Sequence, residues 1–110
     1  MASLADLQKS IDEFTRQNNL LTSTESRLLD LTSEVGELCK ARLKATNYGR
    51  WQHHDGPPFG WIDELGDVFY SLICLANQDG VDLEMALERA LKKYHDRIEK
   101  RGSPVSGREA

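Results

Sequence analysis

Two short acidic motifs are the residues of this chain best suited to chemistry. The segment EVGE spans residues 34–37, and the segment DELGD spans residues 63–67. In a helix, residues three apart are neighbours on the surface, so Glu34 lies beside Glu37 and Glu64 lies beside Asp67. One such pair is ordinary on any solvated helix, because acidic side chains are common there. Only the joint placement of the two pairs can indicate a site.

The helical period predicts that placement. At 100° per residue, Glu34 lies about 40° outside one edge of the apolar arc of its helix, and Glu64 about 20° outside the matching edge of its own. Glu37 and Asp67 each lie about 60° further round in the same sense. If the two helices pack antiparallel with their apolar arcs facing, as a hairpin requires, these flanks fall on the same edge. We therefore expect four carboxylates to line one groove.

Four clustered carboxylates repel one another and raise each other's pKa, a penalty that a divalent cation removes. Ligands that are all oxygen suit Mg²⁺, with Mn²⁺ as a possible substitute, rather than Zn²⁺. A di-iron carboxylate site is the rival interpretation, but it requires Glu-x-x-His motifs, which this sequence lacks. The acidic motifs therefore predict a magnesium site.

A pair of cations further along the chain fits a phosphate-bearing substrate. Lys93 and Arg97 are four residues apart, and Lys100 and Arg101 follow a turn later. Two cations one helical turn apart can grip a polyphosphate. The alternative interpretation is a solvated basic helix end, which the helix dipole favours.

The segment between the two acidic motifs carries rings and imidazoles. Residues 46–58 read TNYGRWQHHDGPP, and their glycines and prolines forbid a continuous helix. The aromatic and imidazole side chains in and just after this break could stack on or hydrogen-bond a base, or could plug the loop against the helices. A zinc site at the adjacent histidines is disfavoured, because neighbouring side chains diverge and no further soft ligand is nearby. The side chains concerned are Trp51, His53, His54 and Trp61.

Four helices are expected to position these residues. The first carries apolar residues at helical spacing from Leu4 to Phe14, is capped by Ser3 and ends near Asn18. The second runs from about residue 23 to 45, with Thr22 and Glu25 resembling a capping box. The third runs from about residue 59 to 78, and the fourth follows the capping residue Asp82 and ends near residue 102. No segment shows strand alternation, so the fold class is all-α.

Length and composition define the class of protein. The 110 residues predict one helical domain over residues 1–102, followed by a loose tail over 103–110. The net charge of −4 argues against non-specific nucleic-acid binding. No apolar run is long enough to span a membrane, and the N-terminus lacks a signal-peptide pattern. Cys39 and Cys74 are expected to be buried free thiols, which favours a cytoplasmic location.

The acidic motifs in their helical order, with the contexts SEVGEL and DELGDVFY and the later pair Lys93 and Arg97, resemble the MazG-like nucleoside triphosphate pyrophosphohydrolases. The resemblance covers about residues 4–101. It implies a four-to-five-helix bundle of the all-α NTP pyrophosphatase type, completed by assembly into a homodimer or homotetramer. It also implies that Lys93 and Arg97 contact phosphates and that four carboxylates bind Mg²⁺, namely Glu34, Glu37, Glu64 and Asp67.

The expected reaction is metal-assisted hydrolysis of a nucleoside triphosphate at the α–β phosphoanhydride, giving the monophosphate and pyrophosphate. Glu37 is the first candidate to orient or deprotonate the attacking water, and a role in nucleotide-pool house-cleaning is what the resemblance suggests. No covalent nucleophile is indicated, since neither Ser33 nor Cys39 has an evident activating base. Two alternatives stay open: a non-catalytic helical dimer that binds nucleotides or a protein, and an enzyme acting on phosphoribosyl-ATP.

Overall fold

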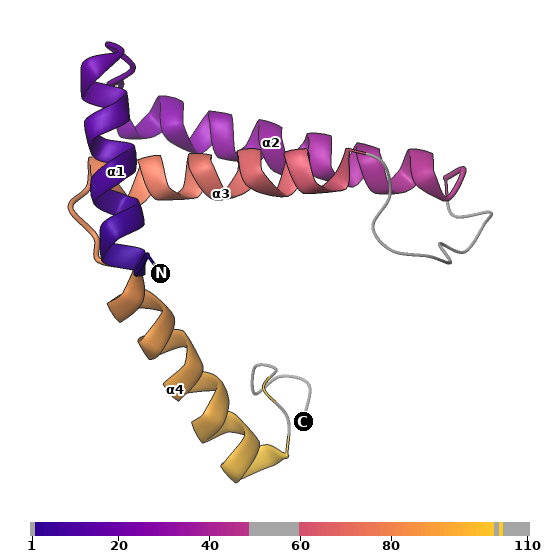
Figure 1. Ribbon diagram of the computed structural model, residues 1–110. Coiled ribbons are helices and arrows are strands. Elements are labelled where there is room, and N and C mark those ends of the chain that lie inside the picture. The colour runs from indigo at the N-terminus through magenta and orange to yellow at the C-terminus, as the bar shows by residue number, and fades with distance from the viewer. Residues whose placement is uncertain (1, 49–59, 103, 105–110) are drawn as a thin grey trace.

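The described residues form four helices and contain no strand. The computed structural model describes residues 2–48, 60–102 and 104. The helices are α1 (Leu4–Gln17), α2 (Thr24–Ala45), α3 (Trp61–Gln78) and α4 (Leu83–Arg101). Figure 1 shows α2 and α3 side by side as a long hairpin, with α1 crossing one end and α4 leading away from it. The predicted all-α class and the four predicted helices are confirmed.

Capping side chains explain most of the helix starts. The Ser3 hydroxyl accepts from the Asp6 amide at 3.1 Å, and the Asp6 carboxylate accepts from the Ser3 amide at 3.1 Å, so α1 begins with a complete capping box. Asp82 caps α4 as predicted, accepting from the first-turn amides. The capping box predicted at Thr22 and Glu25 is wrong. The N-cap of α2 is Ser23, which has an extended backbone.

A glycine precedes α3. The helix begins at Trp61, two residues later than expected, directly after Gly60, which has φ 82° and belongs to the left-handed region that favours glycine. No side chain of the described residues caps this helix start. The turn geometry at Gly60 thus determines where α3, and with it the second acidic motif, starts.

The α2–α3 hairpin is antiparallel, as the sequence geometry required. The Thr24 hydroxyl at the start of α2 donates to the Asp79 carboxylate just after α3, at 2.9 Å. At the other end of the hairpin, the Arg42 guanidinium lies 6.0 Å from the centre of the Trp61 ring, a cation–π contact. The two contacts tie both ends of the hairpin together and fix the register of α2 against α3.

The buried apolar core is small and sits on α3. Its members among the described residues are Ile73, Cys74 and Ala76. Cys74 is buried and free, as predicted, whereas Cys39 is free but exposed, so its predicted burial is wrong. Apolar spacing on α2 indicates which face of the helix could be buried, but it does not show whether another element covers that face. None of the described helices is both long and apolar enough to cross a membrane.

Amide side chains tie α1 to the turn between α3 and α4. Gln8 donates to the Asn77 side-chain oxygen at 3.0 Å, and Asn77 donates back to the Gln8 carbonyl at 2.9 Å. The Gln8 amide group also donates to the Val81 carbonyl at 2.9 Å and accepts from the Leu83 amide at 3.0 Å. One side chain of α1 therefore contacts the end of α3, the turn and the first residue of α4.

Helix α4 is the least covered element. It has no buried residue, although Leu87 and Leu91 repeat at helical spacing and are 52% and 58% exposed. Figure 1 shows it pointing away from the α2–α3 hairpin. Its apolar stripe is therefore left uncovered by the described parts of the chain.

Candidate functional site

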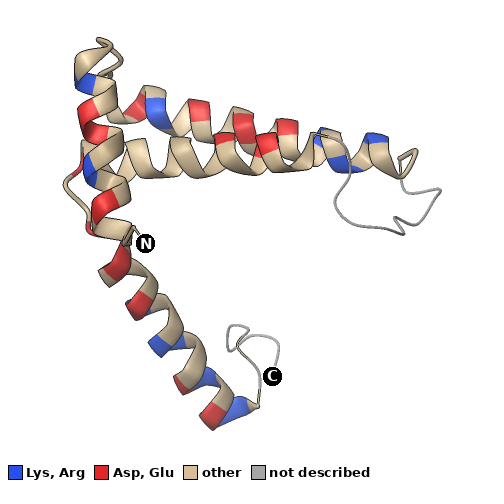
Figure 2. Ribbon diagram, viewed as in Figure 1, with Lys and Arg blue, Asp and Glu red and all other residues tan. Residues whose placement is uncertain are grey.

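The acidic motifs meet in the middle of the hairpin. Glu34 on α2 and Glu64 and Asp67 on α3 each offer a carboxylate oxygen, and these oxygens lie within 4.8 Å of one another. Glu34 and Glu64 are half-buried, while Asp67 is exposed. Figure 2 shows acidic residues of both helices, coloured red on the ribbon, along this part of the hairpin. The structure thus brings three of the four predicted carboxylates together.

The cluster is electrostatically strained without a counter-charge. Partial burial raises the pKa of Glu34, and repulsion by Asp67 and then Glu64 raises it further. Glu37 and Asp30 add smaller contributions to the same pKa, in the same direction. Each of these effects disfavours the ionised carboxylate, a penalty that a bound cation would offset.

Glu37 lies next to this cluster rather than in its centre. It lines a groove together with Glu64, and the groove continues toward the end of the hairpin where α2 ends and α3 begins, with Gly60 forming part of its wall. Two basic residues of α2, Lys40 and Lys44, line the same groove. Neither lysine forms an ion pair within the described parts of the chain. The carboxylates and these two ammonium groups therefore share one groove.

A second groove lies on the other side of the cluster, toward α1. It is lined by Arg27, Asp30, Glu34, Asp67, Tyr70 and Ser71. The Arg27 side chain is only 9% exposed; it donates to the Leu20 carbonyl and lies 3.7 Å from Asp30. Burial raises the pKa of Tyr70, so its phenol stays protonated and can donate a hydrogen bond. This side of the cluster offers a hydroxyl, a phenol ring and an already engaged cation.

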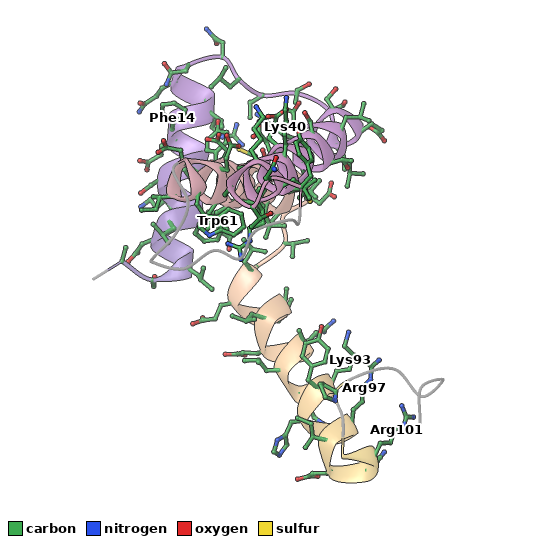
Figure 3. All side chains as sticks on the ribbon, turned by 90° about the vertical axis from the view of Figure 1, so that its right-hand side faces the viewer. Phe14, Lys40, Trp61, Lys93, Arg97 and Arg101 are labelled. Carbon is green, nitrogen blue, oxygen red and sulfur yellow. The ribbon has the colours of Figure 1, made fainter. Side chains whose placement is uncertain are left out.

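The predicted phosphate contacts on α4 lie apart from the carboxylates within one chain. Figure 3 shows Lys93 and Arg97 far along α4, away from Lys40 and Trp61 on the hairpin. The Lys93 ammonium lies 5.1 Å from the centre of the Tyr94 ring, and Arg97 donates to the Pro104 carbonyl at 3.1 Å. Neither residue has a carboxylate partner in the described chain.

The candidate base-binding residues are only partly described. Trp51, His53 and His54 lie outside the described residues. Trp61 is half-buried at the first turn of α3, where it packs against Arg42.

The sequence analysis did not predict several residues that line the two grooves: Lys40, Lys44, Arg27, Asp30, Tyr70 and Ser71. The first two are three and seven residues after Glu37, a same-face spacing that could have revealed them once the carboxylate edge was known. Arg27 is buried through contacts with the α1–α2 connection, for which no local pattern exists.

The donor set fits a hard divalent cation. Three carboxylates from two helices, close enough to share an ion, supply only oxygen ligands, as Mg²⁺ prefers. No histidine or thiol belongs to this cluster among the described residues, so a zinc or di-iron site has no support in it.

Comparisons with known proteins agree with this geometry. The model of the MazG nucleotide pyrophosphohydrolase domain family matches residues 22–102, which include both acidic motifs. The uncharacterized protein YpjD of Bacillus subtilis is 31% identical over 97 residues, covering 86% of each chain. The crystal structure of YpjD, for which a pyrophosphatase activity has been suggested, matches with a TM-score of 0.70 at 26% identity. That match covers 88% of this chain and 97% of the other.

Proposed function

Because this chain belongs to the MazG nucleotide pyrophosphohydrolase family, we propose that it hydrolyses nucleoside triphosphates at the α–β phosphoanhydride in a Mg²⁺-dependent reaction. The products are the nucleoside monophosphate and pyrophosphate. The observation that carries the proposal is the cluster of Glu34, Glu64 and Asp67, whose oxygens lie within 4.8 Å of one another on two helices. A role in clearing surplus or damaged nucleotides follows from that activity.

The carboxylates would hold the metal, with Mn²⁺ as a substitute for Mg²⁺. Glu34, Glu64 and Asp67 form the centre of the site, and Glu37 stands beside it in the same groove. When bound, the ion supplies Lewis acidity and offsets the charge of the phosphate oxygens. The positive charge of a bound ion would also relieve the repulsion that raises the pKa of Glu34.

Glu37 is the residue that we assign to the attacking water. It is exposed in the groove beside Glu64, so its carboxylate is free to accept a proton from a water molecule there. The water oxygen forms a bond to the α-phosphorus while the bond from that phosphorus to the bridging oxygen breaks. The electron pair leaves with pyrophosphate, whose negative charge nearby cations stabilise.

Lys93 and Arg97 enter this proposal as phosphate contacts that act through assembly. Within one chain α4 leads away from the carboxylates, so its cations would reach a triphosphate only if subunit contacts or a change in the direction of α4 bring them there. The uncovered stripe of α4, including Leu87 and Leu91, supports assembly into a homodimer or homotetramer.

A panel of nucleoside triphosphates incubated with Mg²⁺ and the protein tests the proposal through pyrophosphate release. Activity on phosphoribosyl-ATP alone would assign a different substrate to the same site. Binding of nucleotides without release of pyrophosphate from any member of the panel would contradict the enzymatic proposal and favour a binding protein.

A further inference from the structure

The groove beyond Glu37 carries two lysines that the proposed reaction has not used. Lys40 and Lys44 line it together with Glu37 and Glu64. Relative to Glu37, they lie one and two turns along α2, about 4.5 and 10.5 Å along the helix axis and within about 60° of the same direction. The two ammonium groups therefore continue the carboxylate edge toward the end of the hairpin where α2 ends and α3 begins.

We propose that Lys40 and Lys44 form a pyrophosphate-binding subsite, so that the substrate lies along the hairpin with its β- and γ-phosphates toward Gly60. The inference rests on the proposed function, and it adds the direction in which the substrate lies and two residues that bind it.

Charge distinguishes the two sides of the cluster. On the side toward Gly60, the groove has two ammonium groups without ion-pair partners in the described chain and small wall residues, Ala41, Ala45 and Gly60. Ammonium groups bind phosphate oxygens through charge-assisted hydrogen bonds. Small wall residues leave room for a phosphate chain to approach the helix surface.

The opposite side is unsuited to phosphates. There Asp30 adds a negative charge, and Arg27, the one cation among the described lining residues, is buried and already donates to the Leu20 carbonyl. Tyr70 and Ser71 instead offer a ring and hydroxyls, groups that contact a sugar or base. With the α-phosphate at the carboxylates, the remaining phosphates therefore extend toward Lys40 and Lys44, and the nucleoside extends toward Tyr70.

The two lysines also differ from the cations of α4 in how their position relative to the carboxylates is determined. Lys40 is on the helix that carries Glu34 and Glu37, so its position relative to the carboxylates is set by one helix alone. Lys93 and Arg97 are on an element without a buried residue. A phosphate subsite on α2 is complete within one chain.

The test replaces both lysines by methionine, Lys40→Met with Lys44→Met, which keeps side-chain length and helix propensity. Titration calorimetry in Mg²⁺ then measures binding of inorganic pyrophosphate and, separately, of a nucleoside monophosphate. We expect the dissociation constant for pyrophosphate to rise by about tenfold or more, and that for the monophosphate to change by less than about twofold. Lys9→Met, an exposed lysine on α1, is the matched control, and the Lys40→Arg, Lys44→Arg variant should restore binding.

The outcomes separate this inference from the proposed function. Unchanged pyrophosphate binding in the double variant, equal weakening of both ligands, or no pyrophosphate binding to the wild-type protein would overturn the subsite. If the wild-type protein releases no pyrophosphate from any triphosphate while the double variant still loses pyrophosphate binding, the subsite stands and the proposed reaction falls. Melting temperatures equal to the parent's confirm that the variants fold.

Discussion

The α2–α3 hairpin carries the two acidic motifs that stood out in the sequence, and helix α4 carries the pair of cations. The structure brings residues of the acidic motifs together but leaves the cations apart from them. In the hairpin, two helices packed antiparallel bring Glu34 of one helix together with Glu64 and Asp67 of the other. Helix α4 forms over the expected residues, but Lys93 and Arg97 remain far from those carboxylates within the chain. Helical periodicity thus predicts neighbours across a tight hairpin, whereas an element without buried contacts has no partner face to place it.

The largest effect should come from removing the metal, which tests the hairpin half of this comparison. Chelation by excess EDTA should reduce pyrophosphate release to background, because Glu34 and its neighbours cannot share one groove with a triphosphate without a cation between them. Added Mg²⁺ or Mn²⁺ should restore the rate of pyrophosphate release. A coupled phosphate assay measures this rate. Full turnover in EDTA, or turnover supported by Zn²⁺ or iron alone, would contradict the carboxylate site.

Neutralising one carboxylate should have the next largest effect. Asp67→Asn keeps the shape of the side chain but removes one oxygen ligand of the metal. Because of this loss we expect kcat to fall about 100-fold or more, where each tenfold fall corresponds to about 1.4 kcal/mol of activation free energy. Asp63→Asn is the matched control: it alters the same motif at an exposed residue outside the cluster. If both variants hydrolyse at the parental rate, the hairpin does not hold the metal.

Neutralising the cations of α4 should act on substrate affinity. The Lys93→Met, Arg97→Met variant should raise KM for a nucleoside triphosphate by about tenfold, the scale of one or two charge-assisted hydrogen bonds. Steady-state kinetics at saturating Mg²⁺ measures the change. An unchanged KM would show that Lys93 and Arg97 do not contact the substrate, and that α4 stays apart from the carboxylates in solution.

The uncovered stripe of α4 makes the assembly prediction testable. Leu87→Ser with Leu91→Ser should convert the homodimer or homotetramer expected for the parent into a monomer, because exposed leucines at helical spacing supply the apolar contact area. Light scattering at micromolar concentration gives the mass of each species. An oligomer of unchanged mass would place the interface elsewhere, for example on the exposed apolar face of α3 that carries Ile62.

The smallest effect concerns the stability of the metal-free protein. The raised pKa of Glu34 means that the folded state disfavours its ionised form, so the charge at neutral pH lowers stability. Glu34→Gln should therefore raise the melting temperature in EDTA, and the difference should shrink as the pH falls and the parental carboxyl is protonated. A lower melting temperature for the variant in EDTA would indicate that Glu34 forms favourable contacts instead.

Much of the fold followed from local signals. The caps Ser3 and Asp82, the helical spacing of apolar residues and the break after residue 45 indicated four helices whose bounds lie within a few residues of those observed. The misplaced cap at the start of α2 shows the limit of such signals: Thr22 and Ser23 are both good capping residues, and the backbone conformation that decides between them depends on the preceding turn.

The candidate site was predictable only where one hairpin determines it. Glu34, Glu64 and Asp67 met as the wheel geometry required. Arg27 was not predictable, because its burial depends on the connection between α1 and α2. The exposure of Cys39 was missed for a related reason: apolar periodicity indicates which face could be buried, and not whether another element covers it.

The contacts of Gln8 with the α3–α4 turn divide the backbone of α4 into two parts with different hydrogen-exchange behaviour. The amide of Leu83 donates to Gln8 and should exchange slowly, in step with α1 and α3. The turns that follow have no buried side chain to protect them, so in the isolated chain their amides should exchange through local fraying, far faster than those of Ile73 and its neighbours. Any assembly that covers α4 should therefore slow exchange beyond its first turn while leaving the Leu83 amide nearly unchanged.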